Sequence, residues 1–162
     1  MAIRNLRFEG DEILRKKSRE VEVVDDRIRE ILNDMVETMH ANNGVGLSAV
    51  QVGILKRLVT VDVWYDDEHT PLKLVNPVIV KESKETHECQ EGCLSFPNKF
   101  AMVERPEKVT VKALDENGKE ITIKGEGLLA QCLCHELNHL DGILFVDLME
   151  PGTLEYLEPN KE

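Results

Sequence analysis

The alternation of apolar and polar positions divides the chain into helical and extended segments. Apolar residues recur at helical spacing from about Asp26 to Asn42, after an aspartate that can cap the start of a helix. The same reasoning predicts a second helix over about Gly127–Leu140. A short helical turn, opened by Asp11, is expected within residues 11–18.

Runs of β-branched and apolar residues predict strands between these helices. Residues 58–64 and 74–80 form two such runs, and Pro77 in the second indicates an edge strand or a bulge. Residues 109–114 and 120–124 flank the turn sequence DENG, which is typical of a hairpin. Strands bracketed by two helices predict one α+β domain over residues 1–162, with a short or frayed tail from about residue 151.

Composition narrows the class of protein. The chain is 41% hydrophobic and 31% charged, values that exclude a disordered tail, and no apolar run reaches the length of a membrane span. The first nine residues lack the apolar core of a signal peptide, so we expect a cytoplasmic protein. A formal net charge of −11 and only 4% aromatic residues argue against stable nucleic-acid binding.

The spacing of the four cysteines does not by itself assign them to a metal site or to disulfides. Cys89 and Cys93 form a CxxxC pair, and Cys132 and Cys134 form a CxC pair. Neither is the CxxC spacing of a zinc ribbon, and a disulfide framework is not expected without a signal peptide.

The second helix carries the sequence HELNH, an HExxH motif. Positions 135 and 139 of a helix lie about 40° apart around the axis and about 6 Å apart along it, so both imidazoles can converge on one metal ion. Glu136 lies on the flank, where it can reach a metal-bound water without being a ligand. The many leucines around the motif predict a buried helix, which we expect to lie at the centre of antiparallel or mixed sheets. Two unpartnered histidines on such a helix would be costly, which favours a metal.

The third ligand is not evident on this helix. Phe145 occupies the position of the last histidine in the longer metzincin motif and cannot bind a metal. Glu155 and Glu158 lie in a proline-flanked tail, a poor scaffold for a ligand. Cys132 lies about two turns from the midpoint of the histidines, and Cys134 points about 100° away from His135, so both are expected to be packing residues.

Two further clusters carry candidate chemistry. In the sequence EGCLS, Cys93 as a thiolate would complete a His₂Cys site with one open position, although an inert buried thiol is the alternative. In the sequence GVGLSAVQ, small residues permit close backbone approach, and Gln51 would be an uncharged donor to a developing oxyanion. A surface or turn glutamine is the alternative for that position.

The three clusters together resemble the peptide deformylase family. That family carries a GΦGΦAAxQ motif, an EGCΦS motif and an HExDH motif in this order, where Φ is an apolar residue. Here they read GVGLSAVQ, EGCLS and HELNH, with similar segment lengths between them. The resemblance covers nearly the whole chain. It implies a hydrolase of protein biosynthesis that removes the formyl group from the N-terminal formyl-methionine of nascent polypeptides and releases formate.

The resemblance also implies a metal centre. Cys93, His135 and His139 correspond to the ligands of one divalent ion, usually Fe(II), with zinc or nickel as alternatives. Metal-bound water would attack the formyl carbon, and Glu136 would act first as general base and then as general acid.

The remaining implied roles concern the substrate. Gln51 and the backbone N–H of Leu94 correspond to oxyanion donors. Gly46 and Glu91 correspond to substrate-binding positions, Gly46 at a rim where the substrate backbone docks as an added strand. The implied partner is a nascent N-formyl-methionyl peptide, and transient contact with the ribosome stays open.

This chain departs from the family motifs at two positions. Asn138 stands where the family usually has Asp, which would leave a basic partner such as Arg105 less well paired. Ser48 replaces a usual alanine. Three alternatives to deformylation remain: a non-catalytic homologue, a zinc endopeptidase of HExxH type, and a metal-stabilised domain closed by Cys89 or Cys132.

Overall fold

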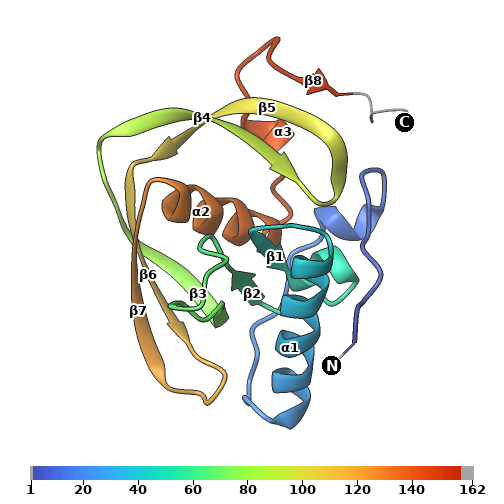
Figure 1. Ribbon diagram of the computed structural model, residues 1–162, viewed down its shortest axis with the longest axis vertical. Coiled ribbons are helices and arrows are strands. Elements are labelled where there is room, and N and C mark those ends of the chain that lie inside the picture. The colour runs from blue at the N-terminus through green and yellow to red at the C-terminus, as the bar shows by residue number, and fades with distance from the viewer. Residues whose placement is uncertain (1, 158–162) are drawn as a thin grey trace.

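The computed structural model describes residues 2–157 (Figure 1). Its helical segments are η1 Glu12–Arg15, α1 Asp26–Ala41, η2 Ala49–Val52, α2 Leu128–Leu140 and α3 Phe145–Leu148. Its strands are β1 Gly46–Ser48, β2 Leu58–Val61, β3 Leu72–Glu82, β4 Thr86–Cys93, β5 Phe96–Pro106, β6 Lys108–Leu114, β7 Glu120–Glu126 and β8 Glu155–Tyr156. No helix within these residues is long and apolar enough to cross a bilayer.

Two antiparallel sheets lie around helix α2. The larger has the order β1-β2-β3-β6-β7, and the smaller has the order β4-β5-β8. Figure 1 shows α2 in the middle of the molecule, with the β4–β5 hairpin on one side and the larger sheet on the other. The leucines of α2 pack against apolar residues of the larger sheet. This arrangement confirms the predicted α+β fold with antiparallel sheets around the HExxH helix.

The predicted helices are present, and side-chain caps mark where α1 and η1 begin. The Asp25 carboxylate accepts a hydrogen bond from the Ile28 N–H at 3.0 Å and so begins α1. The Asp11 carboxylate accepts from the Ile13 N–H at the start of η1. Helix α1 packs its apolar face against β1 and β2, and its C-terminal end leads into residues 42–45, which border the site described below.

The predicted strands differ from the structure at their ends. The strand predicted over 58–64 stops at Val61, because the Asp62 carboxylate turns the chain by accepting the N–H groups of Trp64 and Tyr65. Pro77 lies in β3, an interior strand, where the register shifts between Val75 and Val78. The feature at this proline is therefore a bulge rather than an edge strand.

The β4–β5 hairpin was not delimited by the sequence pattern. Strand β4 is rich in polar residues, which lack the apolar alternation that identifies a half-buried strand. In the tail, residues 155–156 form the short strand β8, which pairs with β5. The remainder of the predicted tail, residues 158–162, lies outside the described residues.

Candidate metal centre and active site

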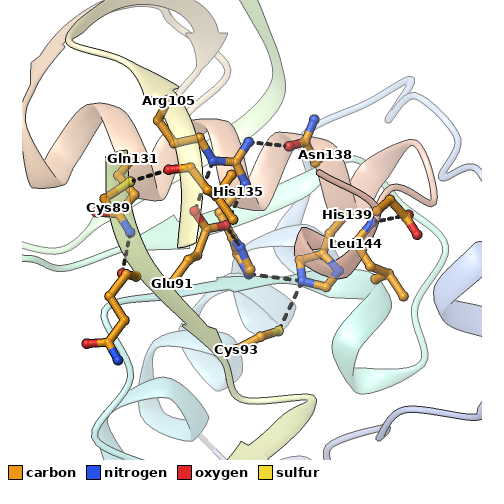
Figure 2. Close-up of polar contacts among 12 residues, drawn as sticks. Cys89, Glu91, Cys93, Arg105, Gln131, His135, Asn138, His139 and Leu144 are labelled. Carbon is orange, nitrogen blue, oxygen red and sulfur yellow. Dashed lines mark hydrogen bonds and ion pairs between the residues drawn. The ribbon is translucent and has the colours of Figure 1, made fainter. Parts of the chain in front are cut away.

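Three potential ligand atoms meet where β4 ends beside α2. The Nε2 atoms of His135 and His139 are 3.2 Å apart, and the Cys93 Sγ lies 3.3 Å from the His139 Nε2. Figure 2 shows the two imidazoles on successive turns of α2, with the Cys93 side chain pointing toward them from the end of β4. Both histidines are buried. The structure thus brings together the three residues that the sequence analysis selected as metal ligands.

The spacing and chemistry of these atoms fit a divalent metal. Ligand atoms about 2.0–2.3 Å from a tetrahedral ion stand about 3.3–3.8 Å from one another. The observed separations of 3.2 and 3.3 Å are close to that range. When the lone pairs of two neutral imidazoles face each other, neither nitrogen has a hydrogen-bond donor as its partner. A divalent cation can bind both nitrogens and a thiolate at the same time. The donor set therefore fits the ion that the motifs imply.

A buried ion pair fixes the orientation of His135. Glu91 Oε1 lies 2.5 Å from His135 Nδ1, so this nitrogen carries the proton and Nε2 keeps its lone pair for a metal. Both Glu91 oxygens also accept hydrogen bonds from Arg105, at 2.5 and 2.9 Å. Burial would raise the pKa of the Glu91 carboxyl, but the hydrogen bonds from His135 and Arg105 lower it to about 2. Glu91 is therefore an anion, and both of its oxygens are hydrogen-bonded to side chains of the protein.

Arg105 extends this network to the position where the motif departs from the family. Its Nη1 donates to the Asn138 Oδ1 at 2.7 Å, and Figure 2 shows this contact continuing through Glu91 to His135. The sequence analysis named Arg105 as the basic partner of this position. The structure pairs it with one carboxylate and one neutral amide.

The Glu136 carboxyl is buried beside the two histidines and is 4% exposed. Its Oε1 has no hydrogen-bond partner among the described residues. Burial raises the pKa of Glu136 to about 7. A carboxyl with such a pKa can both accept and release a proton near neutral pH.

Gly46 allows the backbone of β1 to approach Glu136 closely. A Cβ atom at position 46 would lie 2.5 Å from the Glu136 Oε2, which is closer than real contacts allow. A side chain at position 46 would therefore force the Glu136 carboxylate to shift.

Hydrogen bonds at both ends fix the direction of the Gln51 amide. Its Oε1 accepts from the Ser48 N–H at 3.0 Å and from the Ser48 hydroxyl at 3.1 Å. Because a backbone N–H can only donate, the oxygen end must face Ser48 and the NH₂ end must face the site. The Nε2 lies 3.1 Å from the Ser95 Oγ and 3.4 Å from the Cys93 Sγ. Gln51 is 1% exposed, so the surface alternative for this residue is wrong, although it does lie in the short helical turn η2.

A cavity of about 620 Å³ opens in front of these groups. One wall includes Gly46 of β1 and Val45 just before it, and the other includes Gly92 of β4 and Leu94 in the turn between β4 and β5. The side chain of Leu128, half exposed on α2, borders the opening. The strands on either side, β1 and β4, are both edge strands of their sheets, so each has backbone groups that can pair with an extended peptide.

The other cysteines do not join the centre. Cys132 and Cys134 pack in the core between α2 and the larger sheet, as predicted, and burial raises the pKa of both thiols, that of Cys134 to about 11. The Cys89 Sγ donates to the Val103 carbonyl at 3.3 Å, and burial raises its pKa to about 11. Phe145, at the metzincin ligand position, packs against Phe96.

Two residues near the site were not singled out by the sequence analysis. Ser95 belongs to the quoted EGCLS motif and is fully buried against the Gln51 amide. Tyr65 lies in a loop with no motif, and only the folded chain brings its hydroxyl to the Gly44 carbonyl.

The chain is similar to proteins of one family along most of its length. A family model described as polypeptide deformylase matches residues 3–154. Peptide deformylase 2 of Clostridium acetobutylicum is 57% identical over 150 residues, which cover 92% of this chain and 97% of that protein. The peptide deformylase of Finegoldia magna is 52% identical over 147 residues, covering 91% of this chain and 90% of that protein.

Solved structures of peptide deformylases are also similar to this chain. The crystal structure of a peptide deformylase from Synechococcus elongatus in complex with actinonin matches with a TM-score of 0.89 at 43% identity, covering 91% of this chain and 81% of that one. The peptide deformylase from Thermotoga maritima matches with a TM-score of 0.88 at 36% identity, covering 93% of this chain and all of that one.

Proposed function

Since the chain belongs to the polypeptide deformylase family and is a peptide deformylase, we propose how its own residues remove the formyl group from N-formyl-methionyl peptides. The observation that carries the proposal is the convergence of Cys93, His135 and His139 beside the buried carboxyl of Glu136. We treat residues 1–162 as one catalytic domain that acts on nascent chains in the cytoplasm.

Cys93, His135 and His139 would hold one divalent ion. A thiolate with two imidazoles suits Fe(II), which we propose as the working ion, and also zinc or nickel. When bound, such an ion lowers the pKa of a coordinated water and polarises the formyl oxygen. Glu91 orients His135 through its Nδ1, and Arg105 holds Glu91 in place. We therefore assign Glu91 to positioning His135 rather than to contacting substrate.

Glu136 moves the proton. Its unpartnered Oε1 accepts a proton from the attacking water and later delivers it to the methionine nitrogen as the C–N bond breaks. The products are formate and a free amine. The pKa of about 7, raised by burial, supports both steps.

Gln51 and Leu94 stabilise the negative charge that develops on the formyl oxygen. The Gln51 Nε2 is a fixed donor because Ser48 holds the other end of its amide. The Leu94 N–H follows the ligand Cys93 directly along the cavity wall. Removing one such donor typically costs about 10²–10³ in turnover.

The substrate backbone would enter as an added strand between the two edge strands. Gly46 on β1 and Gly92 on β4 line the cavity from its two sides, and apolar residues such as Leu128 are available to the methionine side chain.

The decisive experiment measures formate release from formyl-Met-Ala-Ser. The protein is purified without oxygen and loaded with Fe(II), and the variant is Glu136→Ala. We expect the variant to retain about one metal per chain and to lose about 10²–10⁴ in turnover, because only the proton transfer is removed.

Glu120→Ala is the matched control, since Glu120 is exposed on β7 and far from the cavity lining. Near-normal turnover in Glu136→Ala, or loss of its metal, would contradict the role of Glu136. Cleavage of unformylated Met-Ala-Ser by the wild type would indicate an endopeptidase instead.

A further inference from the structure

The cavity rim formed by residues 44–46 is held from outside by a loop with no assigned role. This loop, residues 62–65, follows β2 and is called the strap below. The Asp62 N–H donates to the Val45 carbonyl at 2.8 Å. The Tyr65 hydroxyl donates to the Gly44 carbonyl. Two successive carbonyls of the rim are thus engaged by one short loop.

The rim in turn contacts catalytic groups on its inner side. A Cβ at Gly44 would lie 2.6 Å from the Leu94 Cδ1, and a Cβ at Gly46 would lie 2.5 Å from the Glu136 Oε2. The position of the rim therefore decides both the width of the cavity and its distance from Glu136. A bond that holds Gly44 from outside acts on the same segment that a peptide substrate would meet.

The strap is built to present the tyrosine hydroxyl. Buried Asp62 accepts the N–H groups of Trp64 and Tyr65 with one oxygen and lies 2.7 Å from His40 Nε2 with the other. The Tyr65 ring lies 5.0 Å from that imidazole, centroid to centroid.

Tyr65 also has φ of 49°, a left-handed conformation that bulky residues rarely adopt. Its side chain is nevertheless half exposed, so burial of the ring does not account for this conformation.

We propose that Tyr65 is a positioning residue that holds the substrate-binding rim at residues 44–46 through its hydrogen bond to the Gly44 carbonyl. This inference rests on the proposed function. The rim meets the substrate in the ground state and in the transition state alike. A loosened rim should therefore raise KM with little change in kcat, whereas a merely structural role would reduce the active fraction and leave KM unchanged.

The test compares Tyr65→Phe with wild type, both loaded with metal, in formate release from formyl-Met-Ala-Ser. We expect KM to rise about three- to tenfold and kcat to stay within about twofold, as for loss of one hydrogen bond. Tyr156→Phe is the matched control, because the chain has only two tyrosines and Tyr156 lies on β8, outside the cavity lining. Trp64, the single tryptophan, reports by its fluorescence whether the strap stays folded.

Hydrogen–deuterium exchange provides a readout that does not depend on catalysis. Peptides covering residues 42–48 should exchange about three- to tenfold faster in Tyr65→Phe and unchanged in Tyr156→Phe. A KM within twofold of wild type overturns the proposal, whatever happens to kcat. If wild type itself releases no formate, the proposed function fails, and unchanged exchange at residues 42–48 would separately overturn the role of Tyr65.

Discussion

At the scale of single residues, the site depends on hydrogen bonds that determine which atom of each side chain faces the cavity. Glu91 leaves His135 with its lone pair on Nε2, and Ser48 leaves Gln51 with its NH₂ toward the site. The residue types were evident in the sequence. The orientation of His135 was not, because Glu91 lies 44 positions away, whereas Ser48 lies only three positions before Gln51. Asn138 is the clearest case, because the effect of an amide at this position depends on whether it still offers Arg105 an oxygen that accepts a hydrogen bond.

We expect Asn138→Asp to keep turnover within about threefold of wild type, because an oxygen remains to accept from Arg105. Asn138→Ala should lower the free energy of unfolding by about 1–3 kcal/mol, because it leaves a buried guanidinium donor without its acceptor. Denaturant unfolding of both variants, alongside formate release, checks this. Equal stability of Asn138→Ala and wild type would show that the Arg105 contact contributes nothing.

At the scale of elements, the site lies where the edge strand β1 crosses the HExxH helix α2. The helix was predicted well, because its apolar periodicity is local. Strand β1 was not predicted as a strand, since three residues are too few to show an alternation. The β4–β5 hairpin, which supplies Cys93, was not predicted either. Its two strands are recognised by their backbone pairing, because β4 has no alternation of apolar and polar residues.

Close approach of β1 and α2 predicts a specific sensitivity at Gly46. Gly46→Ala should lower kcat/KM at least about tenfold with one metal per chain retained, because the added methyl must displace the Glu136 carboxylate. Kinetics and metal analysis of the purified variant provide the measurement. Gly152→Ala is the control. The added methyl has open space, and although the φ of 78° makes the substitution strained, the residue lies outside the cavity lining, so turnover should stay at the wild-type level. Normal kinetics in Gly46→Ala would mean that Glu136 has room to move.

At the scale of the whole molecule, the metal ligands connect separate parts of the fold. Cys93 comes from the smaller sheet, and both histidines come from the helix that packs on the larger sheet. A bound ion would therefore link these parts, and its binding energy would contribute to the stability of the entire chain.

Zinc added to metal-stripped protein at about one hundred times its Kd should raise the free energy of unfolding by about 2.7 kcal/mol, because the ion binds the folded state selectively. Thermal unfolding with and without zinc measures the gain. Cys93→Ala should lose most of it, whereas Cys134→Ala, which alters a packing thiol, should retain it. A Tm independent of zinc in the wild type would contradict a metal centre at this position.

The sequence by itself determined the features that arise from short-range order: helices α1 and α2, the β6–β7 hairpin, and the three motifs with the family they indicate. The patterns that indicate these features lie among residues close in sequence, so they can be read without knowledge of the rest of the chain. Tertiary structure alone decided how the motifs meet, including the approach of the Gln51 amide to Cys93, the contacts of Glu91 with His135 and Arg105, and the contact of Tyr65 with the rim. These depend on pairing between distant segments, which no local pattern encodes.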